Sequence, residues 1–129
     1  MQICYNEYME INVRSKIWLE IEGETVFGSG RRALLDEIER QGSINKAAKA
    51  INISFRKALS YIQSMESRLG KTLVIRQAGG RNGGGASLTD DARNLLGKYR
   101  KLESGVNEML DKKFAEVFEI NNSKGVNYV

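Results

Sequence analysis

Apolar residues recur at helical spacing on both sides of a short break in the segment from Gly42 to Gly70. Two serines, Ser43 and Ser54, each stand just before such a pattern and are typical helix N-cap residues. The break between the two patterns falls at Asn52 and Ile53. This arrangement predicts a helix-turn-helix.

The second pattern separates into two faces when successive residues are placed about 100° apart. The apolar face holds Phe55, Ala58, Leu59, Ile62, Met65 and Leu69. The polar face holds Arg56, Lys57, Ser60, Ser64 and Ser67, with Tyr61, Gln63 and Arg68 at its margins. We expect the apolar face to pack in the core. We expect the polar face to be a surface of hydrogen-bond donors small enough to lie in a DNA groove.

The first helix of the pair, Ser43 to about Ile51, has its own inner stripe. That stripe is Ile44, Ala47, Ala48 and Ile51. The small alanines allow the second helix to cross closely, while Lys46 and Lys49 point outward, where a helix crossing a sugar-phosphate backbone needs cations.

Upstream, an alternating pattern from Lys16 predicts a strand with Ile17, Leu19 and Ile21 toward the core. A turn at 22–24 and a return strand at 25–27 complete a small hairpin. A helix should then follow, with Ser29 as its cap. Its buried stripe is Leu34, Leu35 and Ile38, and its end is at Gly42.

Downstream, the chain predicts a β-wing followed by a long helix. Residues 71–76 and 86–88 read as two strands on either side of the glycine loop 77–85. Thr89 should cap the helix, with Asp90 and Asp91 in its first turn. Its apolar stripe is Ala92, Leu95, Leu96, Tyr99, Leu102, Val106, Met109, Leu110, Phe114, Val117 and Phe118. A stripe of this length exceeds one small core and predicts a homodimer through the 89–118 helix.

The expected fold class is therefore mainly α with a small β component, a winged helix-turn-helix with an N-terminal hairpin. The chain has 129 residues, enough for one modest core. The predicted organisation is a flexible arm at 1–14, a winged helix-turn-helix at 15–88, a linker and dimerisation helix at 89–120 and a frayed tail at 121–129.

Positive charge is concentrated in the helix-turn-helix. Residues 41–81 carry eight Lys and Arg against the single acid Glu66, which gives seven positive charges where the whole chain has only +4. The rest of the chain must then sum to minus three. Such asymmetry is typical of phosphate binding.

Composition argues against catalysis. The chain has no histidine, so the usual proton shuttle and Ser-His or Cys-His nucleophiles are missing, and its acidic clusters fit helix starts and solvated strands. Cys4, the single cysteine, cannot form an internal disulfide. No apolar run is long enough for a membrane span and no secretory pattern begins the chain. We expect a cytoplasmic protein that is not an enzyme and needs no cofactor or metal.

The glycine loop needs a separate comparison with nucleotide sites. Gly80 and Gly85 have the spacing of a phosphate-binding Walker loop, but Ala86 stands where that motif has lysine, and a strand-like segment follows instead of a helix. A bland hairpin loop and a DNA-binding wing with Arg81 at its tip both remain open.

Several of these segments resemble a known family. AAKAINIS, IQSMESRLG, the following strand and SLTDDARNLL are similar in order and spacing to the N-terminal winged helix of LysR-type regulators. Glu66, Leu69, Gly70, Leu88 and Thr89 stand at matching positions. The glycine wing at 79–85 resembles more specifically that of the ModE molybdate-responsive regulators. The whole resemblance covers roughly residues 16–118, and the wing is its most specific part. The resemblance implies a DNA-reading role for Ser54, Arg56, Lys57, Ser60 and Tyr61. It also implies a DNA-binding half without the molybdate-sensing modules that usually follow.

The sequence thus predicts a dimeric transcription regulator that binds double-stranded DNA at an inverted-repeat operator. Arg56 or Lys57 should reach guanine, and Ser60, Tyr61 and Ser64 should serve bases or phosphates. The phosphate contacts should come from Lys46, Lys49, Lys71 and Arg81, and the remaining candidate DNA-binding residues are Ser43, Ser54 and Asn82. Two alternatives stay open: a protein-interaction module whose long apolar stripe binds a separate effector subunit, and a nonspecific architectural DNA-binding protein.

Overall fold

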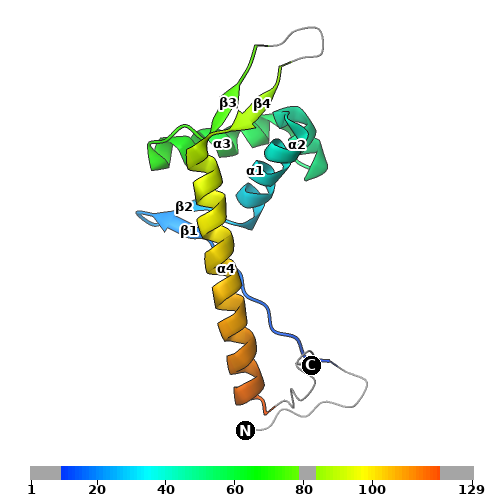
Figure 1. Cartoon of the computed structure of the whole chain (residues 1–129), viewed down its shortest axis with the longest axis vertical. Coiled ribbons are helices and arrows are strands. Elements are labelled where there is room, and N and C mark those ends of the chain that lie inside the picture. Colours follow the sequence, from blue (N-terminus) through cyan, green and yellow to red (C-terminus); the bar gives the residue numbers. More distant parts are fainter. Residues whose placement is uncertain (1–9, 79–83, 120–129) are drawn as a thin grey trace. The chain divides into compact units, whose positions relative to one another are not determined.

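The computed structural model describes residues 10–78 and 84–119. Its contacts divide the chain into two units, Ile17–Tyr99 and a second that joins Met1–Lys16 to Arg100–Val129. Eight elements follow one another within these described residues (Figure 1). The fold is mainly helical with two small antiparallel hairpins, a winged helix-turn-helix.

The first hairpin pairs β1 (Leu19–Ile21) with β2 (Glu24–Phe27), as the alternating pattern predicts. Glu22 and Gly23 both have positive φ, 52° and 81°. Two-residue hairpin turns favour this backbone conformation because its twist matches the twist of the flanking strands. Ile17 and Leu19 pack against the core, but Ile21 is 37% exposed. The expectation that Ile21 faces the core is wrong, because it stands next to the turn where no other element covers it fully.

The first helix, α1 (Ser29–Gln41), buries Leu34, Leu35 and Ile38 completely, as predicted. It ends at Gly42, whose left-handed backbone (φ 69°) lets its N–H donate to Ile38 O at 2.8 Å. The predicted Ser29 cap is wrong: the N-cap is Gly28, without a side-chain hydrogen bond. Gly28 O already accepts the Arg32 N–H at 2.8 Å, so the helix begins one residue earlier than the serine would require.

The wing pairs β3 (Val74–Arg76) with β4 (Ala86–Leu88), which confirms both predicted strands, the first in a shorter form. Two connections hold its base. Ala86 N–H donates to Gly42 O at 2.9 Å, and the Glu66 carboxylate accepts the Leu73 and Val74 N–H groups at 2.8 and 3.1 Å. The wing is therefore fastened to the end of α1 and to the helix that contains Glu66.

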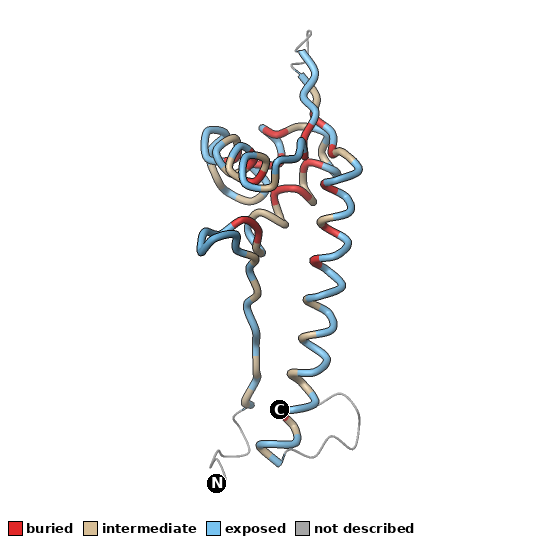
Figure 2. Tube along the Cα trace, turned by 90° about the vertical axis from the view of Figure 1, so that its left-hand side faces the viewer, coloured by how far each residue is buried: buried red, intermediate tan, exposed pale blue. Residues whose placement is uncertain are grey.

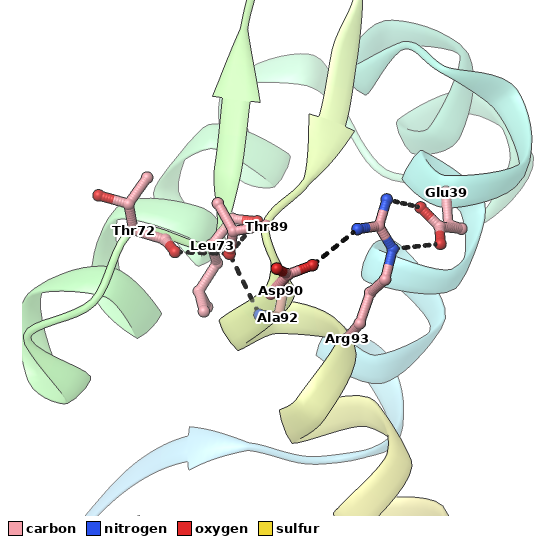
Figure 3. Close-up of polar contacts among 7 residues, drawn as sticks. All are labelled: Glu39, Thr72, Leu73, Thr89, Asp90, Ala92 and Arg93. Carbon is pink, nitrogen blue, oxygen red and sulfur yellow. Dashed lines mark hydrogen bonds and ion pairs between the residues drawn. The ribbon is translucent and has the colours of Figure 1, made fainter.

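The long helix, α4 (Asp90–Val117), is capped by Thr89 as predicted (Figure 3). The Thr89 hydroxyl accepts the Ala92 N–H at 3.2 Å and donates to Thr72 O at 2.7 Å. One turn later, Arg93 reaches Glu39 of α1 through Nε at 2.9 Å and Asp90 at 3.4 Å. The hydrogen bond with Arg93 lowers the pKa of Glu39, and the same contact raises the pKa of Arg93.

The core of the Ile17–Tyr99 unit ends with Tyr99 of α4. Its hydroxyl donates to Ile17 O at 2.7 Å, and its ring meets Phe27 edge to face at 5.0 Å. Buried residues occur in β2, in the three helices that follow it along the chain, in the wing strands and in the first turns of α4 (Figure 2). Beyond Tyr99 the predicted stripe is only partly covered, since Leu102, Met109 and Val117 are exposed.

The second unit contains the rest of α4 and residues 10–16, which form no regular element. Ser15 donates to Asn107 Oδ1 at 2.7 Å, and the rings of Phe114 and Phe118 lie 4.9 Å apart. Most of the expected arm and the expected tail at 121–129 lie outside the described residues. The predicted division at residues 15, 89 and 121 stays a prediction.

Candidate nucleic-acid interface

The central pair consists of α2 (Ile44–Ala50) and α3 (Phe55–Leu69). Both predicted caps are present: Ser43 Oγ accepts the Lys46 N–H at 3.1 Å, and Ser54 Oγ accepts the Lys57 N–H at 3.0 Å. Asn52 turns the chain between the helices with φ 65°, a conformation that asparagine tolerates. Each serine hydroxyl keeps its own hydrogen and can still donate it to a phosphate oxygen.

Helix α3 is amphipathic, as its sequence pattern predicts. Ala58, Ile62 and Met65 are buried, while Arg56, Lys57 and Ser60 are exposed to solvent. The helix ends at Gly70, which has a left-handed backbone with φ 66°. The first turns of α3 therefore present two cations and a hydroxyl group on the side opposite the core.

Phe55 does not follow the predicted face. It was expected in the core with Ala58 and Ile62, but 41% of it is exposed. It is the first residue of α3, and side chains on a helix lean toward the N-terminus. The phenyl ring therefore extends past the start of the helix, beyond the residues that cover the rest of its face.

Tyr61 is half-buried and packs against the hydrophobic core. The Arg31 guanidinium lies 4.9 Å from the centre of its ring and the Lys57 ammonium 5.9 Å, both within the range of cation–π attraction. Arg31 also donates to Thr25 O at 2.9 Å, which links α1 to the first half of β2 in the first hairpin. The Tyr61 ring thus holds two cations beside α3, a role that its position in the sequence did not predict.

Ser64 lies further along α3 and away from the helix start. It borders a shallow hollow together with Ser67, Arg68 and two residues of the first hairpin, Ile21 and Glu22. Arg68 is paired with Glu24 of the same hairpin at 3.5 Å. The polar face of α3 is thus open at its start and flanked by the hairpin at Ser64.

Several exposed cations of the helix-turn-helix and wing have no carboxylate partner among residues 10–78 and 84–119. We call them the unpaired cations: Lys46, Lys49, Arg56, Lys57, Lys71 and Arg76. The single acid of the predicted basic segment, Glu66, accepts two backbone N–H groups at the wing base. Its carboxylate therefore binds the backbone of the wing and does not pair with these cations.

An open hollow of about 580 Å³ lies between α2, the start of α3 and the two strands of the wing. Its walls come from the start of α2, from Phe55 of α3 and from the ends of both wing strands nearest the glycine loop. Ser43, Asn45 and Lys46 line it on one side, and Arg76 and Gln77 on the other. The structure thus brings two unpaired cations from distant parts of the sequence, Lys46 and Arg76, to the same hollow.

The predicted residues are distributed unevenly around this hollow. Ser43 and Lys46 line it directly, and Ser54, Arg56 and Lys57 adjoin Phe55 at the start of α3. Lys71 follows Gly70 at the opposite end of α3. Arg81 and Asn82, the predicted wing tip, lie outside the described residues.

The sequence reasoning missed Phe55, Asn45 and Arg76 as residues of this site. Arg76 carried one available signal, since it is the last strand residue before the glycine loop. Nothing in the local pattern marked Asn45 or distinguished Phe55 from its buried neighbours. Among the described residues, no helix is both long and apolar enough to cross a membrane.

Comparison with known proteins gives consistent results. The family described as "Bacterial regulatory helix-turn-helix protein, lysR family" matches residues 32–93. The chain is 40% identical over 98 residues to the Molybdenum transport protein ModE of Azotobacter vinelandii, across 76% of this chain and 36% of that protein. It is 42% identical over 73 residues to the Transcriptional regulator ModE of Haemophilus influenzae, across 57% of this chain and 29% of that protein. The chain therefore spans about a third of the length of the curated relatives it matches.

A solved structure supports the same fold. The crystal structure of the CbnR_DBD–DNA complex covers 68% of this chain and 95% of its own chain, with a TM-score of 0.54. At 20% sequence identity this likeness concerns the fold alone.

Proposed function

Since residues 32–93 belong to the LysR-type family of bacterial regulatory helix-turn-helix proteins, with ModE regulators among the relatives, we propose that this chain binds an inverted-repeat operator as a homodimer. The family match over residues 32–93 supports DNA binding by this segment, and the proposal extends to how the chain reads DNA. A regulator of chromosomal DNA acts in the cytoplasm, and its relatives' names point to genes of molybdenum supply.

The observation that carries the proposal is the exposed start of α3. Arg56, Lys57 and Ser60 project from a helix whose opposite face is buried, and no carboxylate among the described residues neutralises the two cations. Arg and Lys that enter the major groove reach the O6 and N7 acceptors of guanine. We assign this role to Arg56 and Lys57.

Phosphate contacts come from the elements that flank α3. Lys46 and Lys49 of α2 and Lys71 after α3 are exposed, so they can approach the two backbones of a duplex. The Ser43 and Ser54 hydroxyl groups stand at the starts of the two helices, where a phosphate can accept their hydrogens. These contacts set the position of the protein on DNA and carry no sequence information.

The uncovered stripe of α4 supports the proposed dimer. Leu102 is 45% exposed and Met109 is 65% exposed, with Val106 half-buried between them at helical spacing. A second copy that packs on this stripe removes its apolar surface from water. Two symmetry-related α3 helices then require a symmetric operator.

The test is selection of bound fragments from the source genome with the full chain, followed by footprinting under heparin competition. We expect two protected half-sites related by an inverted repeat, a dimer in sedimentation and bound fragments next to genes of metal supply. The same exposed stripe of α4 favours a second function, a protein-interaction module. A tight complex with another protein, together with complete loss of DNA binding at physiological salt, would support that function instead.

A further inference from the structure

Phe55 occupies an unusual position for a large apolar side chain. It begins α3, immediately after the Ser54 cap and immediately before Arg56. Ala58 and Ile62, on the same side of the helix, are 0% and 4% exposed, whereas Phe55 is 41% exposed. Part of the apolar surface of Phe55 is therefore exposed to solvent and not buried in the core.

The surroundings of the ring are cationic. Phe55 lines the open hollow between Lys46 of α2 and Arg76 of β3, and Arg56 follows it in the chain. Lys46, Arg56 and Arg76 are all exposed and have no carboxylate partner in the described part of the chain. A polyanion that binds these cations would bring its own surface against the phenyl ring.

We propose that Phe55 is a specificity-determining residue that contacts the C5-methyl group of a thymine in the major groove. This inference rests on the proposed function, because it needs the start of α3 to lie in that groove. Thymine alone among the four bases presents a methyl group there, and apolar side chains, phenylalanine included, are the groups that contact it. The neighbouring cations hold phosphates or guanine, so Phe55 supplies an apolar contact that the polar residues of α3 cannot make.

The test removes only the methyl group. Once selection has defined an operator, each thymine in a half-site is replaced in turn by deoxyuridine, and the dissociation constant of the full chain is measured by fluorescence anisotropy. Burial of one methyl group predicts about a fourfold loss of affinity at one thymine per half-site. Phe55→Ala should bind the thymine and deoxyuridine operators equally, and Phe55→Leu should keep part of the preference.

Circular dichroism of both variants separates a folding defect from a lost contact, and the deoxyuridine ratio compares two DNAs with the same folded protein. Specific binding by the wild-type protein without any thymine that responds to deoxyuridine would overturn the role of Phe55 and leave the proposed function standing. A deoxyuridine effect that persists undiminished in Phe55→Ala would also overturn the role of Phe55 and leave the proposed function standing. Absence of sequence-specific binding would overturn the proposed function together with this inference.

Discussion

Two regions of the Ile17–Tyr99 unit use arginine and lysine in opposite ways. At the junction of α1 and α4, Arg93 lies between Glu39 and Asp90, and Arg40 is paired with Glu37 at 2.8 Å. At the start of α3 and along α2, Arg56, Lys57 and Lys46 have no carboxylate partner among the described residues. Charge in the first region connects elements, whereas charge in the second is available to a ligand.

The difference shows why net charge alone is a poor guide to a binding surface. Both regions are rich in Lys and Arg, but only the second lacks acids that would compete with phosphate. Glu66 illustrates the point, because it is the one acid of residues 41–81 and its carboxylate accepts the backbone N–H groups of Leu73 and Val74. Variants of the two regions should therefore change different properties.

Arg56→Ala should have the largest effect on DNA binding. Loss of a contact to guanine costs about 1–3 kcal/mol and relaxes specificity at one base pair. A base-substitution scan of the operator by anisotropy measures both effects. The matched control is Arg40→Ala, which removes an exposed arginine paired with Glu37 and should leave affinity almost unchanged. Equal, sequence-independent losses in the two variants would contradict the reading role of Arg56 and favour an architectural DNA-binding protein.

Glu66→Ala should mainly change stability. It leaves the Leu73 and Val74 N–H groups at the wing base without their acceptor, at a cost of about 1–3 kcal/mol in the free energy of unfolding. Glu66→Gln keeps an acceptor oxygen at this position and should lose less. Urea denaturation of both variants measures the difference. If removal of the negative charge were the important change, the two variants would instead gain the same DNA affinity with unchanged stability.

Lys46→Ala should weaken binding to all DNA sequences alike. One phosphate contact fewer reduces the slope of log affinity against log salt by about one. Titrations at several salt concentrations measure this slope. Lys98→Ala is the control, because Lys98 is exposed on α4 without a carboxylate partner in the described part of the chain, away from the hollow. A slope that falls equally for Lys98→Ala would show that any exposed lysine of this unit contributes, and would break the contrast between the regions.

Local signals in the sequence predicted the elements well. The caps at Ser43, Ser54 and Thr89 and the left-handed glycine at Gly42 each depend on a few neighbouring residues, and the structure confirms all four. Periodicity also identified the buried residues of α1 and most of those of α3. These features follow from local backbone geometry, which sequence spacing encodes.

The errors concern residues whose surroundings depend on distant parts of the chain. Residue spacing predicts on which face of α3 Phe55 lies. It does not reveal that the core fails to cover the first residue of that helix. For Ser64 the prediction stays untested, but nothing local indicates that Ile21 and Glu22 border the same hollow. Likewise, the hollow between Lys46 and Arg76 exists only after the wing folds back onto the end of α1.

Glu39→Gln tests the other side of the comparison and should have the smallest effect. Arg93 lowers the pKa of Glu39, so the stabilisation from this pair is present above the ordinary carboxyl pKa and is lost as the pH falls through the lowered folded-state value. The variant should melt slightly below the wild-type protein at pH 7, and the two melting temperatures should converge once the pH falls below the lowered pKa of Glu39. Differential scanning calorimetry across this range, on protein without DNA, measures the change.

Convergence is expected because a protonated glutamate and a glutamine have nearly the same shape and charge, so acid makes the two proteins equivalent at this position. Glu108→Gln provides the control, since Glu108 is exposed on α4 and has no cationic partner in the described part of the chain. Its melting temperature should follow that of the wild-type protein at every pH. A difference for Glu39→Gln that stayed constant throughout the acid range would mean that the pair acts through geometry rather than charge. Arg93 would then no longer contrast with the unpaired cations of α3.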